Sequence, residues 1–207
     1  MSARRLRELA GVAPLFRAGG TLALGQTALL LIDYQNEYRQ GPLALPDEAT
    51  ASAAAIRLRN WAEQLGLLVI HVQHQAPAAS PLFAAGSPGA GALAGLAPAA
   101  GQPLVVKRLP SAFAGTELAE VLQGAAIDTL LIAGYMTHNC VDSTARDAFH
   151  RGYRVGIVGE ACATRDLPAA DGSIIPAALV HAAVLAGLAD RIAEIVDLPM
   201  LAAMLPG

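Results

Sequence analysis

The sequence predicts a three-layer α/β/α fold built on a six-stranded parallel sheet, and three observations carry this prediction. Short apolar runs alternate with segments of helical periodicity along most of the chain. The run 27–33 is almost continuously apolar, which is typical of a strand buried on both faces. Neither an internal repeat nor a linker interrupts the 207 residues, so we expect one domain over 1–207.

Six segments are predicted to be strands of this sheet: 27–33, 67–72, 104–107, 129–133, 154–158 and 193–196. Helices are predicted over 47–65, 117–123, 140–151 and 174–189. Thr116 is the expected N-cap of the second helix, and glycines follow the first three helices as stop signals. Strands that alternate with helices imply right-handed crossovers and a parallel sheet covered on both faces.

Two segments do not fit the alternation. Residues 1–26 form an N-terminal extension, and 75–102 is a long stretch rich in proline and glycine. Its composition alone would also suit a disordered linker. Because a loop of this length inside a compact domain is uncommon and usually functional or disordered, we expect 75–102 to cover a site.

Composition and charge exclude several classes of protein. Apolar residues make up 54% of the chain against 15% charged, and the net charge is −3. No basic cluster suggests nucleic acid, and no apolar run reaches the ~20 residues of a membrane span. The two cysteines, Cys140 and Cys162, do not make a disulfide framework, which indicates a reducing, cytoplasmic location.

Three reactive residues lie at or just beyond the ends of predicted strands. Asp33 ends the first strand, Lys107 ends the third, and Cys140 follows the fourth. Because ligands bind at the carboxyl ends of strands in such sheets, we expect the three side chains to meet there. Taken singly, each has an ordinary reading as a turn former, a solvated lysine or a buried thiol. A helix start and a nearby ammonium are both expected to favour the Cys140 thiolate.

Three blocks of sequence carry a specific resemblance. In 134–147, Gly134 is followed by Thr137 and then by Cys140-Val141, while 30–38 contains Asp33 and 106–118 contains Lys107. Together and in this order, the blocks resemble the isochorismatase-like cysteine hydrolase superfamily over about 28–196. The resemblance implies a Rossmann-type strand order and a single hydrolase domain that needs no cofactor and forms a homo-oligomer, a dimer or a tetramer.

The resemblance also implies roles for these residues. Asp33 would be the general base, Lys107 would hold the ion pair, and Cys140 would attack the carbonyl of a small amide, carbamoyl or ureido compound. Backbone N–H groups of Met136 and Cys140 would bind the oxyanion. A non-proline cis peptide bond is expected between Met136 and Thr137.

Other side chains in or near the blocks are candidates for the substrate pocket, with packing or loop anchoring as the alternative: Gln35, Tyr38, His74, Phe113, Tyr135 and His138. His71 is expected to be structural. The Asp-x-His…His metal site of nicotinamidases has no counterpart here, so no metal is predicted.

Two other functions stay open at this point. One is hydrolysis of a vinyl ether without a covalent intermediate, although several enzymes of that type lack a cysteine at the position of Cys140. The other is a catalytically silent binding protein on the same scaffold, against which the intact Asp33, Lys107 and Cys140 set argues.

Overall fold

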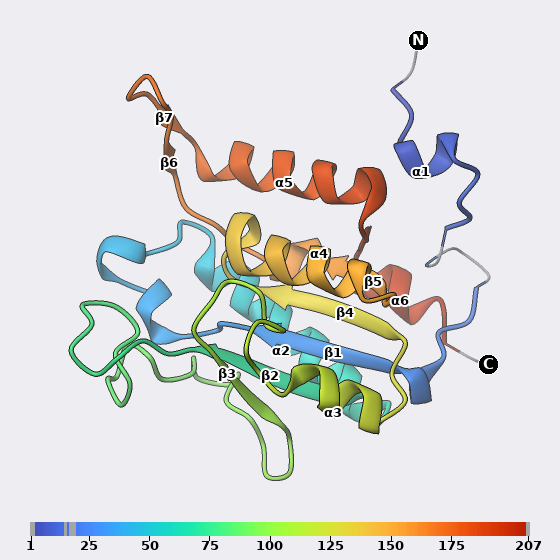
Figure 1. The fold of residues 1–207 in the computed structure, drawn as a ribbon, viewed down its shortest axis with the longest axis horizontal. Helices are drawn as coiled ribbons and strands as arrows, with labels where there is room; N and C mark the ends of the chain where they lie inside the picture. The colour runs from blue at the N-terminus through green and yellow to red at the C-terminus, as the bar shows by residue number, and fades with distance from the viewer. Residues whose placement is uncertain (1–2, 15, 17–19, 206–207) are drawn as a thin grey trace.

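A computed structural model describes residues 3–14, 16 and 20–205. Its centre is a six-stranded parallel sheet in the order β3-β2-β1-β4-β5-β8 (Figure 1). The strands are β1 Thr27–Ile32, β2 Leu68–His74, β3 Leu104–Lys107, β4 Thr129–Gly134, β5 Arg154–Val158 and β8 Glu194–Val196. The predicted parallel α/β fold and all six predicted strands are therefore confirmed.

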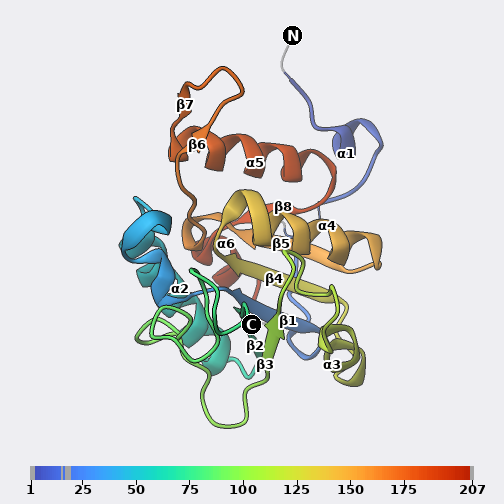
Figure 2. The same cartoon turned by 60° about the vertical axis from the view of Figure 1, so that its left-hand side comes forward.

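Helices cover both faces of the sheet. On one face lie α2 (Glu48–Gln64) and α6 (Leu198–Ala202), and on the other lie α3 (Leu118–Gly124), α4 (Asp142–His150) and α5 (Ala177–Arg191) (Figures 1 and 2). Alternate β1 residues divide between the two layers: Leu29 and Leu31 pack toward α2, while Leu30 and Ile32 pack toward α3 and α4. Burial on both faces explains the continuous apolar run that predicts this strand.

The strand order places a switch point at the middle of the sheet. From β1 the chain moves outward through β2 and β3, then returns to β4 on the other side of β1 and continues through β5 to β8. The carboxyl ends of β1 and β4 lie side by side, with Ile32 paired to Gly134. In open α/β sheets, ligands bind in the crevice at this position.

The predicted helix over 174–189 differs from α5 at both ends, because α5 begins at Ala177 and ends at Arg191. Ile174–Ile175 is a short strand, β7, that pairs antiparallel with β6 (Leu167–Pro168) in a small separate hairpin. Pro176 is the N-cap residue of α5, and the Asp166 carboxylate accepts a 2.7 Å hydrogen bond from the Ala177 N–H. The apolar periodicity continues through both elements, so it does not reveal the boundary that the proline and the Asp166 contact set.

Two smaller differences concern helix starts. The N-cap of α3 is Glu117 rather than Thr116, whose hydroxyl lies one residue earlier and accepts a 3.3 Å bond from the Leu118 N–H. The α-helix predicted from 140 begins at Asp142, because a turn with π-helical hydrogen bonding precedes it.

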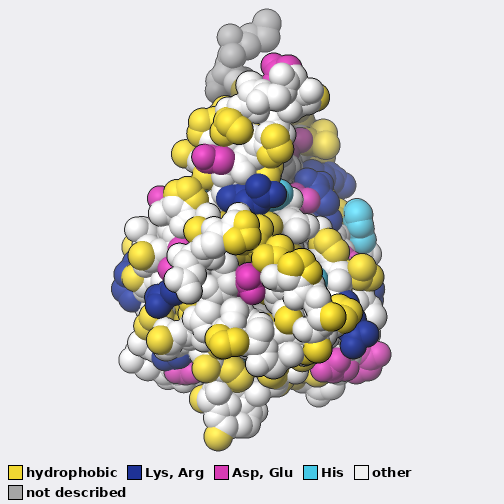
Figure 3. Space-filling model, turned by 90° about the vertical axis from the view of Figure 1, so that its left-hand side faces the viewer, with side chains coloured by type: hydrophobic (Ala, Val, Ile, Leu, Met, Phe, Trp, Pro, Cys, Tyr) yellow, Lys and Arg dark blue, Asp and Glu magenta, His cyan; other side chains and the backbone are white. Residues whose placement is uncertain are grey.

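The N-terminal extension is tied to the far edge of the sheet. Within it, α1 (Leu6–Leu9) contributes Arg7, which forms a buried 2.5 Å ion pair with Glu194 of β8. The Leu6 N–H donates to Asp190 of α5. On the face shown in Figure 3, charged side chains of both signs are interspersed with apolar ones. No helix in the described part of the chain is long and apolar enough to cross a membrane.

Gly134 is the position at which the sheet most clearly requires glycine. Its φ is +149°, and a Cβ there would lie 2.1 Å from the Ile32 carbonyl oxygen. We predict that Gly134→Ala lowers the free energy of unfolding by about 3–5 kcal/mol, because backbone atoms of two adjacent strands would have to separate. Thermal unfolding should show a melting temperature lower by roughly 10 °C or more.

Gly187→Ala is the matched control. Gly187 lies within α5, and nothing approaches within 4 Å of the Cβ that alanine would add. That variant should be neutral or more stable, because glycine inside a helix costs about 0.5–1 kcal/mol relative to alanine. Equal melting temperatures for the two variants would contradict the proposed strand contact at Gly134.

Candidate active site

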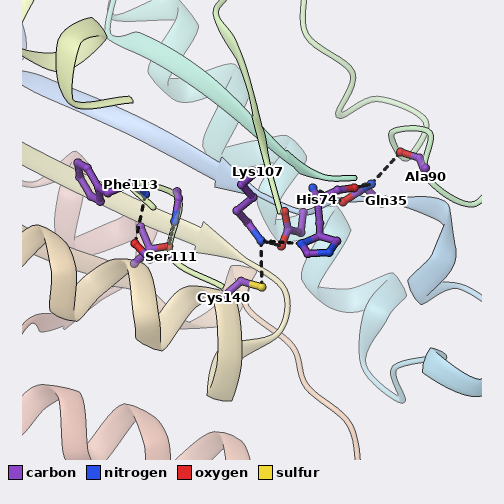
Figure 4. Close-up of polar contacts among 10 residues, drawn as sticks. Gln35, His74, Ala90, Lys107, Ser111, Phe113 and Cys140 are labelled. Carbon is purple, nitrogen blue, oxygen red and sulfur yellow. Dashed lines mark hydrogen bonds and ion pairs between the residues drawn. The ribbon is translucent and has the colours of Figure 1, made fainter. Parts of the chain in front are cut away.

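The side chains of Asp33, Lys107 and Cys140 meet at the carboxyl edge of the sheet, as predicted. We call these three residues the triad; Lys107 and Cys140 are labelled in Figure 4. Asp33 follows β1, Lys107 is the last residue of β3, and Cys140 lies in the turn Thr137–Val141 between β4 and α4. We call this segment the Cys140 turn. Lys107 reaches across the end of β2, which lies between β3 and β1.

The Lys107 ammonium contacts both other groups. Its Nζ lies 2.7 Å from Asp33 Oδ2 and 3.2 Å from Cys140 Sγ. The exposed fraction is 0% for Asp33, 1% for Lys107 and 4% for Cys140. Because both side chains are buried, the opposite charges of Asp33 and Lys107 interact strongly, and each is the main compensation for burial of the other.

The environment shifts the protonation of all three groups. Burial raises the pKa of the Asp33 carboxyl, although the Lys107 charge opposes this. Burial alone would lower the pKa of Lys107, but the neighbouring Asp33 and Cys140 raise it above its ordinary value. Burial and the Asp33 charge raise the pKa of the Cys140 thiol to about 12. With its pKa raised in this way, Cys140 is a thiol at neutral pH beside the ion pair. The Lys107 ammonium, which favours the thiolate, is outweighed by burial and by the Asp33 charge.

Asp33 has an unusual backbone. Its φ is +55°, in the left-handed region, where aspartate is more readily accommodated than most side chains. The Asp33 N–H still extends the sheet by donating to the Val72 carbonyl at 2.9 Å, and the Asp33 carbonyl accepts from Gln35 at 2.8 Å. The chain thus turns sharply at the end of β1, a conformation of the kind that clusters at functional sites.

The Cys140 turn is held by backbone hydrogen bonds at its start. The Met136 carbonyl accepts from the N–H groups of Asn139 and Val141, and the Thr137 N–H donates to the Ala163 carbonyl. A non-proline cis bond is present, but it joins Tyr135 to Met136 rather than Met136 to Thr137. The predicted position is wrong by one residue. The Met136–Thr137 bond is trans, so its carbonyl and N–H point in opposite directions, the first to Asn139 and Val141 and the second to Ala163.

Gln35 anchors the 75–102 loop. Its side-chain amide donates to the carbonyls of His74 and Ala90, and its oxygen accepts from the His74 N–H. These contacts occupy both ends of the amide, which is fully buried. The geometry favours loop anchoring, one of the two roles considered for Gln35.

The next two residues bind the same loop and were not identified from the sequence. The Asn36 N–H donates to the Gly91 carbonyl, and its side chain donates to Pro88. Glu37 accepts a 3.1 Å bond from the Phe83 N–H. The polar run directly after Asp33 is the signal that could have revealed this role.

Phe83 is the loop residue that reaches the site. Its ring lies 5.2 Å from His74 and 5.3 Å from Tyr38, measured between ring centroids. Burial raises the pKa of the Tyr38 hydroxyl, and the charges of Asp33, Cys140 and Glu37 raise it further. The loop therefore contributes an aromatic wall beside the triad, and the only sequence signal for it is a single phenylalanine within a proline- and glycine-rich segment.

His74 contacts the triad directly. Its Nδ1 lies 3.4 Å from Lys107 Nζ (Figure 4). Burial and the Lys107 charge lower the pKa of His74, so the ring is neutral at physiological pH. Because an ammonium can only donate, Nδ1 is the acceptor and the imidazole proton resides on Nε2.

The other three pocket candidates point to different surroundings. Phe113 stacks on Tyr153 and lies beneath the Arg151 guanidinium, away from Cys140 (Figure 4). The Tyr135 hydroxyl donates to the Glu48 carbonyl in the core on the α2 side. His138 Nδ1 lies 2.5 Å from the Thr164 hydroxyl.

His71 is buried, and its Nε2 lies 2.9 Å from Gln102 Oε1, in keeping with the expected structural role. Among the residues that the structure describes, no three His, Cys, Asp or Glu side chains are grouped as metal ligands.

Comparison with known proteins places this arrangement in a family. Residues 27–197 match the isochorismatase domain, which covers all six strands of the sheet. The chain belongs to the isochorismatase family. It is accordingly a hydrolase of the isochorismatase-like cysteine hydrolase type, as the resemblance implies.

Individual relatives agree with this family assignment in both fold and sequence. An isochorismatase structure from Pseudomonas putida KT2440 superposes with a TM-score of 0.87 at 35% identity, covering 95% of this chain and 97% of that one. The secreted isochorismatase effector Isc1 of Verticillium dahliae is 33% identical, with 81% of this chain and 85% of the effector aligned. Maleamate amidohydrolase of Pseudomonas putida is 32% identical, with 67% and 72% aligned.

The buried ion pair should be visible in stability measurements. We predict that Lys107→Met lowers the free energy of unfolding by about 3–5 kcal/mol, because it leaves Asp33 buried without its charged partner. The double variant Asp33→Asn/Lys107→Met should lose less than the sum of the two single variants. Asparagine is suitable at position 33 because it tolerates the left-handed backbone.

Denaturant unfolding of the four proteins measures this coupling. Additivity within about 0.5 kcal/mol would contradict a direct interaction between the two charges.

Proposed function

We propose that the chain is a cysteine hydrolase that cleaves a C–N bond of a small amide, carbamoyl or ureido compound through a thioester on Cys140. The observation that carries the proposal is the simultaneous contact of Lys107 with the Asp33 carboxylate and the Cys140 sulfur. A carboxylate of raised pKa beside a thiol, with an ammonium bridging them, is the set that general-base activation of a nucleophile requires.

The first half of the reaction forms the thioester. Asp33 accepts the Sγ proton, and the sulfur of Cys140 attacks the substrate carbonyl carbon to give a tetrahedral oxyanion. Lys107 stabilises the thiolate as it forms. The C–N bond then breaks, and Asp33 transfers its proton to the leaving nitrogen.

The second half releases the product. Water attacks the thioester carbon while Asp33 accepts one of its protons, and the C–S bond breaks as Cys140 leaves. The proton on Asp33 returns to the sulfur, which restores the thiol and gives a carboxylic or carbamic acid. Each turnover therefore consumes one water molecule and returns every group to its starting state.

We propose the backbone N–H groups of Met136 and Cys140 as the oxyanion donors. Both residues belong to the segment between β4 and α4 that also carries the attacking sulfur, which supports this assignment. One such donor is often worth about 3 kcal/mol in transition-state stabilisation.

The substrate class rests on chemistry and on likeness. A relative aligned over 67% of this chain is named for amide hydrolysis, as maleamate amidohydrolase. The triad is almost fully enclosed, which suits a small substrate. We propose Tyr38 and His74 as pocket residues, with the Nε2–H of the neutral His74 ring as a donor to a substrate oxygen.

We retain two further proposals about the protein's setting. Both cysteines are free thiols, which suits a cytoplasmic location. We also propose that the chain assembles with identical copies into a homo-oligomer, either a dimer or a tetramer.

Removal of the thiol should abolish turnover. An ammonia-release screen across small amides, ureas and carbamoyl acids should identify a substrate for the native protein, and Cys140→Ala should reduce kcat by at least about 10⁴-fold. Cys162→Ala is the matched control, since Cys162 is equally buried but contacts neither Asp33 nor Lys107 in the described structure. Retained turnover in Cys140→Ala would instead favour hydrolysis without a covalent intermediate.

The pH dependence of kcat/KM should follow the three shifted groups. Asp33 must be deprotonated to accept the thiol proton, so activity should fall with decreasing pH at a value above the ordinary aspartate range of about 4. Because the pKa of Lys107 is raised, no loss should occur below about pH 10.4 from its deprotonation. The ordinary pKa of cysteine is about 8.5. A rise in activity centred near that pH would contradict a Cys140 thiol whose pKa is about 12.

A further inference from the structure

We propose that His181 of α5 is a positioning residue that holds the Cys140 turn in its productive geometry. This inference rests on the proposed role of Cys140 as the nucleophile. His181 lies 41 residues beyond Cys140 in the sequence and has no part in the steps described above. Its Nδ1 lies 2.9 Å from the hydroxyl of Thr137, the first residue of the Cys140 turn.

Thr137 connects the Cys140 turn to neighbouring segments through hydrogen bonds. The residue is fully buried, and both its N–H and its hydroxyl donate to the Ala163 carbonyl, at 3.0 and 3.1 Å. A threonine hydroxyl has one proton, and the Ala163 carbonyl can only accept. The arrangement that satisfies all three groups therefore has His181 donating from Nδ1 to the Thr137 oxygen.

This contact joins the Cys140 turn to α5, a helix that contributes none of the three triad residues. The segment after β5 holds the turn from one side, through the bonds to Ala163 and through the contact of His138 with Thr164. His181 holds it from the side of α5. The sulfur of Cys140 is three residues from the fastened threonine, so a shift at Thr137 moves it relative to Lys107 and Asp33.

Packing alone does not fix His181. The ring lines a cavity of about 160 Å³ together with Asp47, Thr164 and Ala178. Because space remains on this side, the hydrogen bond rather than close contact decides where the imidazole lies. A displacement of about 1 Å at a reacting group can cost on the order of 100-fold in rate.

Three substitutions at one position separate the hydrogen bond from packing. Asparagine presents its Nδ2 where histidine has Nδ1, whereas leucine fills similar space without a donor and alanine removes both. We expect His181→Leu and His181→Ala to lower kcat by about 10–100-fold with KM changed less than about 3-fold, and His181→Asn to recover kcat to within about 3-fold of the native value.

His150→Ala is the matched control, because His150 is exposed and lies at the opposite end of α4 from the Cys140 turn. It should leave kcat and KM unchanged. The alkylation rate of Cys140 by iodoacetamide, measured by mass spectrometry, supplies a second readout that does not depend on any substrate. It should change in His181→Leu and return to the native rate in His181→Asn.

The outcomes distinguish this inference from the proposed function. If Cys140→Ala abolishes turnover while His181→Leu and His181→Asn give equal kcat and equal alkylation rates, the positioning role is wrong and the proposed function stands. If Cys140→Ala retains turnover, the proposed function fails, and the alkylation rates alone then decide whether His181 positions the turn. A lower melting temperature with unchanged kcat and alkylation would assign His181 a purely structural role and would also overturn the proposal.

Discussion

The buried ion pair of Asp33 and Lys107 is the interaction on which the arrangement of the site depends. Removing two charges from water costs several kcal/mol for each, and only a close, well-oriented contact compensates for that cost. The 2.7 Å distance between Lys107 Nζ and Asp33 Oδ2 meets this condition. It requires β3 and β1 to end at the same level with β2 between them, so that the lysine can cross the end of one strand.

The same pair determines how Cys140 behaves. An isolated ammonium would favour the thiolate, but here the ammonium is already neutralised by a carboxylate, and burial opposes any further charge. The thiol consequently stays protonated until a proton acceptor removes its proton, and Asp33 is the carboxylate beside it. Local helix geometry and a neighbouring lysine are therefore insufficient to predict the state of a buried cysteine, because the sum of the charges around it decides.

The sequence predicted those parts of the fold and the site that depend on simple spacing. Strand ends in a parallel sheet share one edge, so Asp33, Lys107 and Cys140 could be brought together from their positions after three apolar runs. The hairpin of β6 and β7 could not be predicted, because apolar periodicity continues from Ile174 into α5 and the break depends on one proline and one distant carboxylate.

Other features depended on contacts between segments far apart in the chain. The loop over 75–102 has no periodicity of its own, and its path is set by hydrogen bonds from Asn36 and Glu37. The cis bond lies one residue earlier than expected, because the Met136 carbonyl and the Thr137 N–H bond to different segments and the trans bond between them points the two groups apart. The triad was thus accessible from sequence, whereas its surroundings required the tertiary structure.

This division has a consequence for how such a site can change its substrate. The reacting groups are placed by strand ends, where parallel neighbours on both sides of β1 fix the backbone. The wall of the site comes from a loop whose residue Phe83 is held by the Glu37 carboxylate and whose carbonyls are held by Gln35 and Asn36. Those three anchors follow Asp33 within four positions. The loop can therefore vary in sequence between its anchored points while its position stays coupled to Asp33, so the wall of the site can change without disturbing the contacts among Asp33, Lys107 and Cys140.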